Sequence, residues 1–432
     1  MIERIITKNF RAFKNLDVSF SKINLIFGPN NAGKSSLLSV LNLLSQTLTS
    51  PDYSVPLLLS GKKEDLGTYK DLVFNHDIKN DIEIKLYTKH DMFPFKKRSP
   101  DKKEKLIRGV FNFYYHYKPR RHEIILQKVE LKYPNYNFEI QVEKATKSDN
   151  YYITGYSDSE NYPLEKTESN KVEFMDHFFP RFFRKISKKN ISDIDLINML
   201  FIREIKSIEY IGPFRIPPSR TYLYRGEKFD SVGPRGENAI DILTLDFYRR
   251  EKEKIIDEIS KWFEKCGICE KISINSIGER HFEIGLSNKG KDISDNIADS
   301  GYGCSQILPI LVAGNYIKQN RLFLVEEPEI HLHPKAQAEL GTFFYELSKK
   351  GIQSIVETHS EHLLLRLQAH VADPKCDLSP EDICVYYVYS EDGDKKCVRL
   401  ELDTDGRFKD EWPQGFFPER FEEIKKIVKA SI

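Results

Sequence analysis

Apolar and polar residues recur with different periods along the chain. Residues 23–27 form a short apolar run, and residues 36–44 repeat apolar positions at helical spacing. Between about residues 81 and 160 the period becomes two, which is typical of antiparallel strands with one face in water. The pattern predicts such strands at 82–86, 110–117, 123–132, 137–142 and 151–156.

The rest of the chain mixes both patterns. Helices are predicted at 172–206, 251–266, 307–317 and 335–348, strands at 2–6, 16–20, 208–211, 322–327 and 353–360, and hairpins at 271–286 and 383–402. We predict an α/β fold in which an inserted lobe of antiparallel strands and helices, 81–206, separates two core segments, 1–80 and 207–432.

Composition excludes few partners. The chain has 432 residues, with 66 basic and 65 acidic side chains, so net charge alone favours neither nucleic acid nor a membrane. The apolar run 306–317 is too short to span a bilayer. Met1 leads directly into a strand pattern, without the features of a signal peptide. We expect a cytoplasmic protein without a membrane partner.

The clearest motif is Gly-Pro-Asn-Asn-Ala-Gly-Lys-Ser-Ser at residues 28–36, which fits the phosphate-loop pattern and lies between a predicted strand and helix. Glycines let backbone N–H groups turn toward phosphate oxygens, and the following helix directs its positive end at the same anion. This predicts ATP and Mg²⁺ as ligands, with Lys34 on the β- and γ-phosphates and Ser35 on the metal. The predicted nucleotide-binding residues are Asn30, Asn31, Ala32, Gly33, Lys34, Ser35 and Ser36.

Two further features lie close to this loop in sequence. Arg11, in a turn just upstream, is interpreted either as a solvated surface cation or as a phosphate-side residue, and we include it among the candidate nucleotide-binding residues. Gln46 and the stretch 65–71 are alternative positions for a nucleotide-responsive loop.

A second group of candidates follows the apolar strand near residue 322. Two carboxylates at its end, Glu326 and Glu327, would lie at the ligand-binding edge of an α/β sheet. We predict that Glu326 holds Mg²⁺ through water and that Glu327 orients or deprotonates the attacking water; the alternative is an acidic turn that only ends the strand. His359, after the next strand, is a candidate contact to the γ-phosphate or a simple capping residue.

Other polar clusters have weaker interpretations. His331 and His333 are assigned packing or turn roles in preference to an independent metal site. The Cys-x-x-Cys pair, Cys266 and Cys269, would need a second pair of ligands to bind zinc.

Basic residues gather in the predicted lobe. Residues 88–123 contain eleven Lys and Arg against four Asp and Glu, a local net charge of +7, and a second basic stretch occupies 181–189. The region is interpreted either as solvated loops or as a surface for nucleic-acid phosphates.

The motif order resembles the ABC-type ATPases of the SMC, RecF and OLD group. The residues that carry the resemblance are GPNNAGKSS at 28–36, DSGYGCSQ at 299–306, LFLVEEPEIHLHP at 322–334 and ETHSEH at 357–362. The chain looks closest to compact bacterial AAA-family ATPases often found in phage-defence operons; residues 9–13 and 412–417 also match these compact members. The resemblance covers about residues 1–75 and 205–425, leaving the lobe unmatched, and implies an ABC-type P-loop ATPase head with a mixed sheet and flanking helices.

This resemblance also implies a head-to-tail homodimer around two ATP molecules. Gly301, Gly303 and Ser305 of one subunit would then face the γ-phosphate held by Lys34 and Ser35 of the other. Two positions depart from transporter-type members of the group: the first acid is Glu326 where they usually have Asp, and the signature turn is GYGCSQ in place of LSGGQ.

The leading functional hypothesis is an ATP-driven sensor or clamp for a separately encoded effector, a nuclease or toxin, in antiphage defence. The alternatives are a DNA-repair or DNA-clamping ATPase whose basic lobe binds DNA and, less favoured, a transporter subunit. OLD-type nucleases carry an added Toprim domain, for which the roughly 70 residues after Ser360 are too few. Residues 392–394 resemble a Toprim Asp-x-Asp pair, but Asp-Gly at this place favours a hairpin turn.

Overall fold

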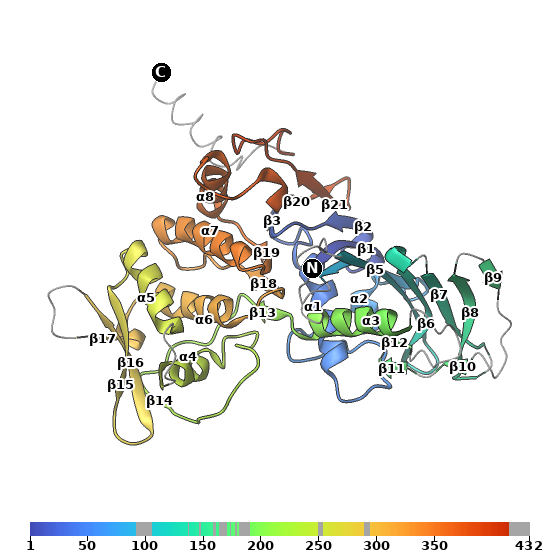
Figure 1. Cartoon of the computed structure of the whole chain (residues 1–432), viewed down its shortest axis with the longest axis horizontal. Helices are drawn as coiled ribbons and strands as arrows, with labels where there is room; N and C mark the ends of the chain where they lie inside the picture. The colour runs from blue at the N-terminus through green and yellow to red at the C-terminus, as the bar shows by residue number, and fades with distance from the viewer. Residues whose placement is uncertain are drawn as a thin grey trace, which may run out of the picture. The chain divides into compact units, whose positions relative to one another are not determined.

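The computed structural model describes residues 1–91, 106–136, 138–146, 148–158, 161–163, 171–172, 174–177, 179–180, 191–248, 254–288 and 294–413 (Figure 1). The chain forms two compact units, neither of which is one continuous stretch. The first contains Met1–Phe20, Asn31–Ile208 and Ser390–Lys396, and the second contains Ser21–Asn30, Glu209–Tyr389 and Cys397–Ile432.

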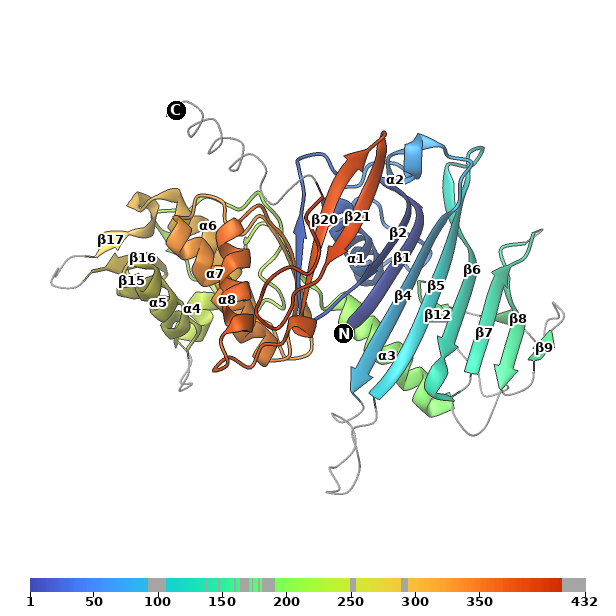
Figure 2. The same ribbon diagram turned by 90° about the horizontal axis from the view of Figure 1, so that it is seen from above.

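The first unit is built on a nine-stranded sheet in which the strands pair in the order β10-β8-β7-β6-β5-β4-β1-β2, with β9 on β8. Its strands lie side by side in Figure 2. Its pairs are antiparallel, and β7 alternates buried with half-buried positions, as the period of two predicts. The strands are β1 (Ile2–Phe10), β2 (Phe13–Ser19), β4 (Ile82–Asp91), β5 (Leu106–Lys118), β6 (Glu123–Tyr133), β7 (Phe138–Lys144), β8 (Tyr151–Asp158), β9 (Asn161–Pro163) and β10 (Lys171–Val172).

The strands predicted for an inserted lobe continue the sheet that the N-terminal hairpin begins. β4 pairs with β1 from Thr88 opposite Ile2 to Glu83 opposite Lys8. Alternation predicts a strand and its two faces, but it does not identify the neighbouring strand. The division into residues 1–80, 81–206 and 207–432 stays a prediction.

Helices of the first unit are α1 (Ser35–Thr49), the short α2 (Tyr69–Leu72) and α3 (Ile191–Lys206). α3 packs on the sheet: the Phe201 ring lies 4.1 Å from that of Phe111, and Asn198 Oδ1 accepts a 2.6 Å hydrogen bond from the Tyr133 hydroxyl.

The predicted helix at 172–206 is wrong in its first part. Residues 171–172 end the large sheet as β10, and β11 (Phe174–Asp176) pairs with β12 (Phe179–Pro180). Pro180 lacks the N–H that a helix interior needs, whereas it is tolerated on a short edge strand. The basic stretch at 181–189 lies outside the described residues.

The second unit contains a six-stranded sheet with the order β13-β18-β19-β3-β20-β21. The pairs from β13 to β20 are parallel, and β20 continues into β21 through a hairpin. Every residue of β3 and β19 is buried, as expected for parallel strands covered on both faces. The strands are β3 (Ile23–Phe27), β13 (Glu209–Ile211), β18 (Leu322–Glu326), β19 (Gln353–Glu357), β20 (Ile383–Glu391) and β21 (Asp394–Leu400).

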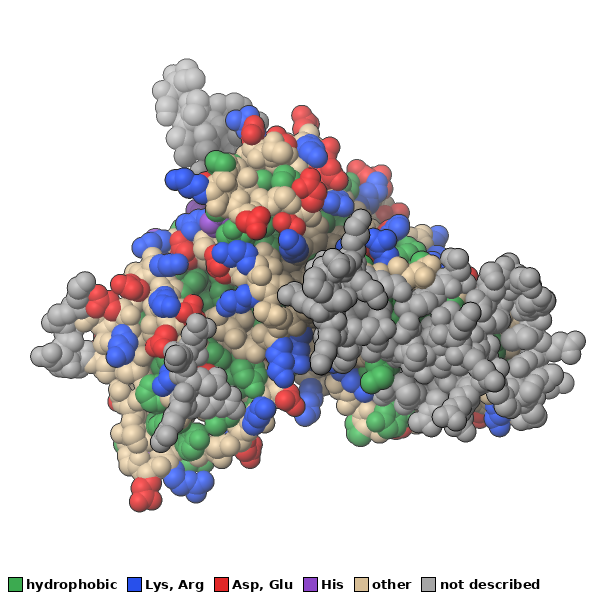
Figure 3. All heavy atoms as spheres, in the orientation of Figure 1, with side chains coloured by type: hydrophobic (Ala, Val, Ile, Leu, Met, Phe, Trp, Pro, Cys, Tyr) green, Lys and Arg blue, Asp and Glu red, His purple; other side chains and the backbone are tan. Residues whose placement is uncertain are grey.

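Helices of this unit are α4 (Ala239–Tyr248), α5 (Ile255–Cys266), α6 (Tyr302–Tyr316), α7 (Pro334–Lys349) and α8 (Glu361–Ala372). A smaller sheet contains β14 (Tyr222–Leu223), β15 (Lys271–Ser276), β16 (His281–Ser287) and β17 (Asp295–Asn296). The predicted hairpins and the helices predicted at 251–266, 307–317 and 335–348 are confirmed over the described residues, as is the α/β class. Figure 3 shows acidic and basic side chains mixed over α7 and α8, so this face has no patch of one charge sign there.

Candidate functional site

The phosphate loop follows β3 and leads into α1, as predicted. Its first glycine, Gly28, has φ +148°, and a Cβ there would lie 2.0 Å from Val388 O. Its second, Gly33, has φ +103°, and a Cβ would lie 2.7 Å from the Cβ of Ala12. Both positions therefore require glycine, which is the backbone property that lets such a loop fold inward around an anion.

Helix α1 begins with a cation at its positive end. Lys34 is the N-cap residue and only 5% exposed, and the first turn carries no acidic side chain. A buried lysine at a helix N-terminus opposes the helix dipole, so a bound anion would offset an unfavourable arrangement. This local charge pattern suits phosphate.

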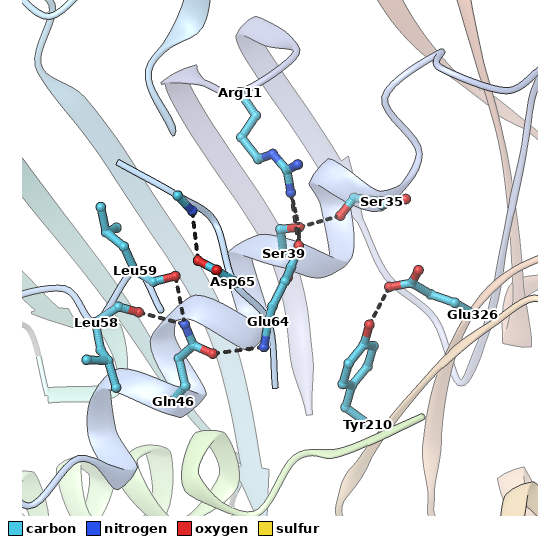
Figure 4. A network of polar contacts seen from close by, with 11 residues as sticks. Arg11, Ser35, Ser39, Gln46, Leu58, Leu59, Glu64, Asp65, Tyr210 and Glu326 are labelled. Atoms are coloured by element: carbon cyan, nitrogen blue, oxygen red, sulfur yellow. Dashed lines mark hydrogen bonds and ion pairs between the residues drawn. The ribbon is translucent and has the colours of Figure 1, made fainter. Parts of the chain in front are cut away.

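One turn into α1, a polar network involves Arg11 (Figure 4). Arg11 Nη1 donates to Ser39 Oγ at 2.6 Å and to Glu64 Oε1 at 3.0 Å, and the Ser39 hydroxyl lies 2.8 Å from the carbonyl of Ser35. The Arg11 side chain is 33% exposed. The hydrogen bonds of Arg11 thus stabilise the first turns of α1. Its contact with phosphate stays a prediction.

Gln46 has a structural role in the same unit. Its Nε2 donates to Leu58 O at 2.6 Å, and its Oε1 accepts from the N–H of Glu64 at 3.2 Å (Figure 4). The side chain is buried and fixes the loop that supplies Glu64. At 65–71, Thr68 and Asp71 form the capping box of α2.

In the second unit, the predicted acids lie at the carboxyl edge of the parallel sheet. Glu326 is in register with Glu357 of β19, and Glu357 is in register with Ile26 of β3. The end of β3, where the phosphate loop starts, and the end of β18 therefore share one edge. Ligands bind at this edge in α/β sheets.

Each of the two acids is fixed by neighbours. Glu326 Oε1 accepts a 2.8 Å hydrogen bond from the Tyr210 hydroxyl (Figure 4). Glu327 has a left-handed backbone, φ 45°, and its N–H donates to Glu357 O at 2.8 Å. Arg215 Nη2 donates to the carbonyls of Glu326 and Glu327 at 2.6 and 3.1 Å. Non-glycine residues in this conformation are found at sites that the surrounding structure holds in place.

Burial at this turn shifts two pKa values. Burial lowers the pKa of Arg215 to about 10, although the carboxylates of Glu329, Glu327 and Glu326 act against the shift. The guanidinium therefore stays charged at neutral pH. Burial raises the pKa of Glu329, and its hydrogen bond from the His359 N–H, at 2.5 Å, acts in the opposite direction.

The three histidines play different parts. His359 has an exposed side chain directly after β19, so its predicted phosphate contact stays a prediction. His333 caps α7, where its Nδ1 accepts from the N–H of Lys335 at 3.3 Å. His331 has φ 63°, and its ring lies 5.8 Å from that of Tyr302. Turn and packing roles account for the last two.

The signature turn caps α6. Gly301 is the N-cap residue, and a Cβ at Gly303 would lie 2.6 Å from His331 O. Ser305 is 5% exposed, and its hydroxyl donates to Tyr302 O at 2.9 Å. A hollow of about 450 Å³ lies against this turn, and its lining includes Gly301, Gly303, His331, His333 and Lys335.

The cysteine pair and the Asp-Gly turn have features of their own. Among the described residues, no three His, Cys, Asp or Glu side chains are grouped to hold a metal ion. Burial raises the pKa of Cys266 and of Cys269 to about 12, so without a bound metal both thiols stay protonated at neutral pH. Asp392 and Gly393 have φ 53° and 87°, which confirms the hairpin turn.

The sequence did not indicate a role for three side chains near Glu326 and Glu327. These are Tyr210, Arg215 and Glu329. Tyr210 lies within the predicted strand at 208–211 and Arg215 follows it, and the signal was a cation two residues after the Gly212-Pro213 pair. Nothing local indicates that β13 pairs with β18, which brings both side chains to the acids.

The structure does not describe parts of two candidate segments. The centre of the basic region, 92–105, lies outside the described residues, as do 414–417 of the near-terminal motif. Within the part of the chain that the structure describes, no helix is long and apolar enough to cross a membrane.

Comparison with known protein families gives two matches. Residues 1–364 match a family described as "AAA ATPase domain", and residues 378–427 match one described as "Protein of unknown function (DUF3696)". A curated relative from Helicobacter pylori, described as an ATP/GTP phosphatase, is 40% identical over 88 residues; that match covers 19% of this chain and 24% of the relative.

Solved structures of SMC heads share low sequence identity with the chain. A SmcHead bound to the C-winged helix domain of ScpA is 16% identical, with a TM-score of 0.48 and coverage of 93% of this chain and 98% of that one. The SMC head domain from Thermotoga maritima is 11% identical, with a TM-score of 0.38 and coverage of 93% and 99%.

Proposed function

Because the chain belongs to the AAA ATPase domain family, we propose that it binds ATP at residues 28–36 and hydrolyses it with Mg²⁺. The observation that carries the proposal is the shared sheet edge in the second unit. β3 ends there at the first glycine of the loop, in register through β19 with Glu326 at the end of β18. Ligands of α/β sheets bind at this edge, so it is the expected place for side chains that contact a nucleotide.

The residues present fit a nucleotide with magnesium. Loop N–H groups from Asn30 to Ser36 and the ammonium of Lys34 would bind phosphate oxygens. Ser35 and Glu326 provide the hydroxyl and carboxylate oxygens that Mg²⁺ prefers, and this metal usually takes only one or two carboxylates besides phosphates. When bound, Mg²⁺ would neutralise charge that develops on the transferred phosphoryl group.

Glu327 is the proposed residue for the attacking water. Its left-handed backbone and its N–H bond to Glu357 O fix the start of the side chain at the sheet edge. Its carboxylate would orient or deprotonate water, a role worth about 10²–10⁴-fold in rate. His359, exposed after the neighbouring strand, would contact the γ-phosphate.

A second copy of the chain would complete the site. The partner subunit's Gly301, Gly303 and Ser305 would approach the γ-phosphate, since a helix N-terminus suits an anion. The hollow beside this turn, with Lys335 and two histidines in its lining, supports an anion-facing role. Because the Ser305 hydroxyl bonds Tyr302 O, the backbone of the turn is the more direct donor.

We further propose that ATP-dependent pairing controls a separately encoded effector, a nuclease or toxin, in antiphage defence. Isolation of the protein from its native host with ATP should yield a stoichiometric partner. Isolation without any partner would count against this proposal.

A DNA-clamping ATPase is the second candidate, favoured by the net charge of +7 over residues 88–123. It predicts salt-dependent DNA binding that is lost when Lys96, Lys97, Arg98, Lys102 and Lys103 are neutralised.

The decisive experiment uses Glu327→Gln. We expect hydrolysis to fall by about 10²–10⁴-fold while ATP still binds, so the variant should accumulate as an ATP-bound dimer. Light scattering after size-exclusion chromatography, with and without ATP and Mg²⁺, measures the dimer. Glu346→Gln is the matched control, because Glu346 is a half-exposed acid on α7 that pairs with Lys349. If Glu327→Gln hydrolyses ATP like the control, or stays monomeric with ATP, the scheme is wrong.

A further inference from the structure

Arg215 is a buried cation whose position the ATPase scheme does not explain. It follows β13 and is only 5% exposed, yet its guanidinium makes its hydrogen bonds to backbone carbonyls. Its Nε and Nη1 have no hydrogen-bond partner among the described residues. A buried guanidinium with open donors is costly, so such an arrangement suggests a function.

The bonds that Arg215 does make are at the turn after β18. One nitrogen, Nη2, bridges the carbonyls of Glu326 and Glu327, which flank the change to left-handed backbone at Glu327. Charge-assisted bonds to both carbonyls hold the peptide between them in one orientation. Arg215 therefore fixes the direction in which the Glu327 side chain leaves the backbone.

The charge of Arg215 acts on the same turn without occupying its carboxylates. Glu326, Glu327 and Glu329 all act to raise the pKa of the guanidinium, so the attraction is mutual. Three acids within four residues repel one another, and a nearby cation reduces this repulsion. Because Arg215 bonds the carbonyls, the Glu327 carboxylate stays available for water.

Glu329 is the second buried residue that holds this turn in place. Its Oε1 accepts the His359 N–H at 2.5 Å, which joins the turn after β18 to the turn after β19. Its Oε2 is buried and has no hydrogen-bond partner within the described part of the chain. A buried carboxylate that accepts a backbone N–H from a neighbouring turn fixes the distance between the two turns.

We propose that Arg215 and Glu329 are positioning residues for hydrolysis: Arg215 sets the direction of Glu327, and Glu329 sets the separation of the Glu327 and His359 turns. This inference rests on the proposed role of Glu327. Neither residue needs to touch ATP. Loss of either should therefore lower kcat and leave the KM for ATP nearly unchanged.

The test compares Arg215→Met with Arg4→Met. Arg4 forms an exposed pair with Asp17 at 2.6 Å in the first unit, so the same substitution there controls for loss of an arginine. A displacement of about 1 Å in a reacting group costs about 10²-fold in rate, which is the expected loss of kcat for Arg215→Met. Arg4→Met should keep the wild-type kcat.

Hydrogen exchange in the nucleotide-free protein gives a readout independent of activity. Arg215→Met should accelerate exchange of the amides of Glu327 and residues 329–331 by at least about tenfold, since their local structure loses the hydrogen bonds from Arg215. Glu329→Ala should accelerate exchange of the His359 amide, and Glu329→Gln, which retains an acceptor oxygen, should do so much less.

Unchanged kcat and unchanged exchange in Arg215→Met would overturn the inference. If that variant does not fold, Arg215→Lys decides. It keeps a buried charge but lacks the planar guanidinium that sets the direction of Nη2, so a lower kcat at constant KM supports the proposal and a wild-type kcat refutes it. Failure of the proposed function is distinguishable, because Glu327→Gln would then hydrolyse ATP normally. If Glu327→Gln is inactive while Arg215→Met is fully active, only the positioning role fails.

Discussion

Replacement of Tyr210 by phenylalanine tests whether Glu326 is a metal carboxylate. The Tyr210 hydroxyl donates to Glu326 Oε1 at 2.8 Å, and the tyrosine is 7% exposed, so little solvent competes for the bond. A hydrogen bond to a charged group contributes about 1.5–3 kcal/mol. At about 1.4 kcal/mol per factor of ten, its loss corresponds to about 10- to 140-fold. Loss of a hydrogen-bond partner of a metal ligand typically weakens metal binding by about 10–100-fold, which agrees.

The assay is the rate of ATP hydrolysis as a function of free Mg²⁺. Tyr210→Phe should raise the Mg²⁺ concentration for half-maximal rate by about 10–100-fold, and ATP binding without metal should be unaffected. Tyr316→Phe is the matched control, because the Tyr316 hydroxyl donates to Phe229 O at 2.7 Å elsewhere in the same unit. If both variants need the same Mg²⁺ concentration as the wild type, Glu326 is not positioned by Tyr210 for metal binding.

Two further predictions concern stability. Gly28→Ala should lower the unfolding free energy by at least about 1–3 kcal/mol in urea denaturation, because φ +148° is strained for alanine and its Cβ would meet Val388 O; wild-type stability would contradict the assigned backbone. Burial, with nearby positive charges, lowers the pKa of His90 from 6.5 to about 3, so the folded chain binds fewer protons than the unfolded chain between these values. Stability should therefore fall as pH drops through this range, by up to about 1.4 kcal/mol per pH unit. Glu204, whose pKa burial raises, acts in the opposite direction. His90→Gln should flatten the dependence and exposed His362→Gln should not; equal slopes would refute the assignment.

Local patterns predicted the phosphate loop and the acid-bearing strand. A strand, a glycine turn and a helix are consecutive in sequence, so residues 23–44 contain the whole signal. The same holds for β18, whose apolar run ends at the two acids. The Asp-Gly pair at 392–393 likewise fixed the hairpin without knowledge of the fold.

Long-range pairing explains what the sequence could not show. Arg215 meets the acidic turn because β13 lies beside β18, more than 100 residues later in the chain. The strand β4 could equally have begun a separate lobe, since alternation does not identify its partner β1. The first part of the helix predicted at 172–206 failed because aromatic residues at close spacing fit short strands as well as a helix.

The central strand of the second unit, β3, is contributed by the N-terminal part of the chain. It pairs with β19 on one side and β20 on the other, although both follow it by more than 300 residues. If the gene were split after Ile208, the downstream polypeptide would lack the middle of its own sheet, and two rows of backbone donors and acceptors would be left open. Co-expression of the two fragments should restore solubility to the downstream one, which makes the protein a natural scaffold for complementation assays.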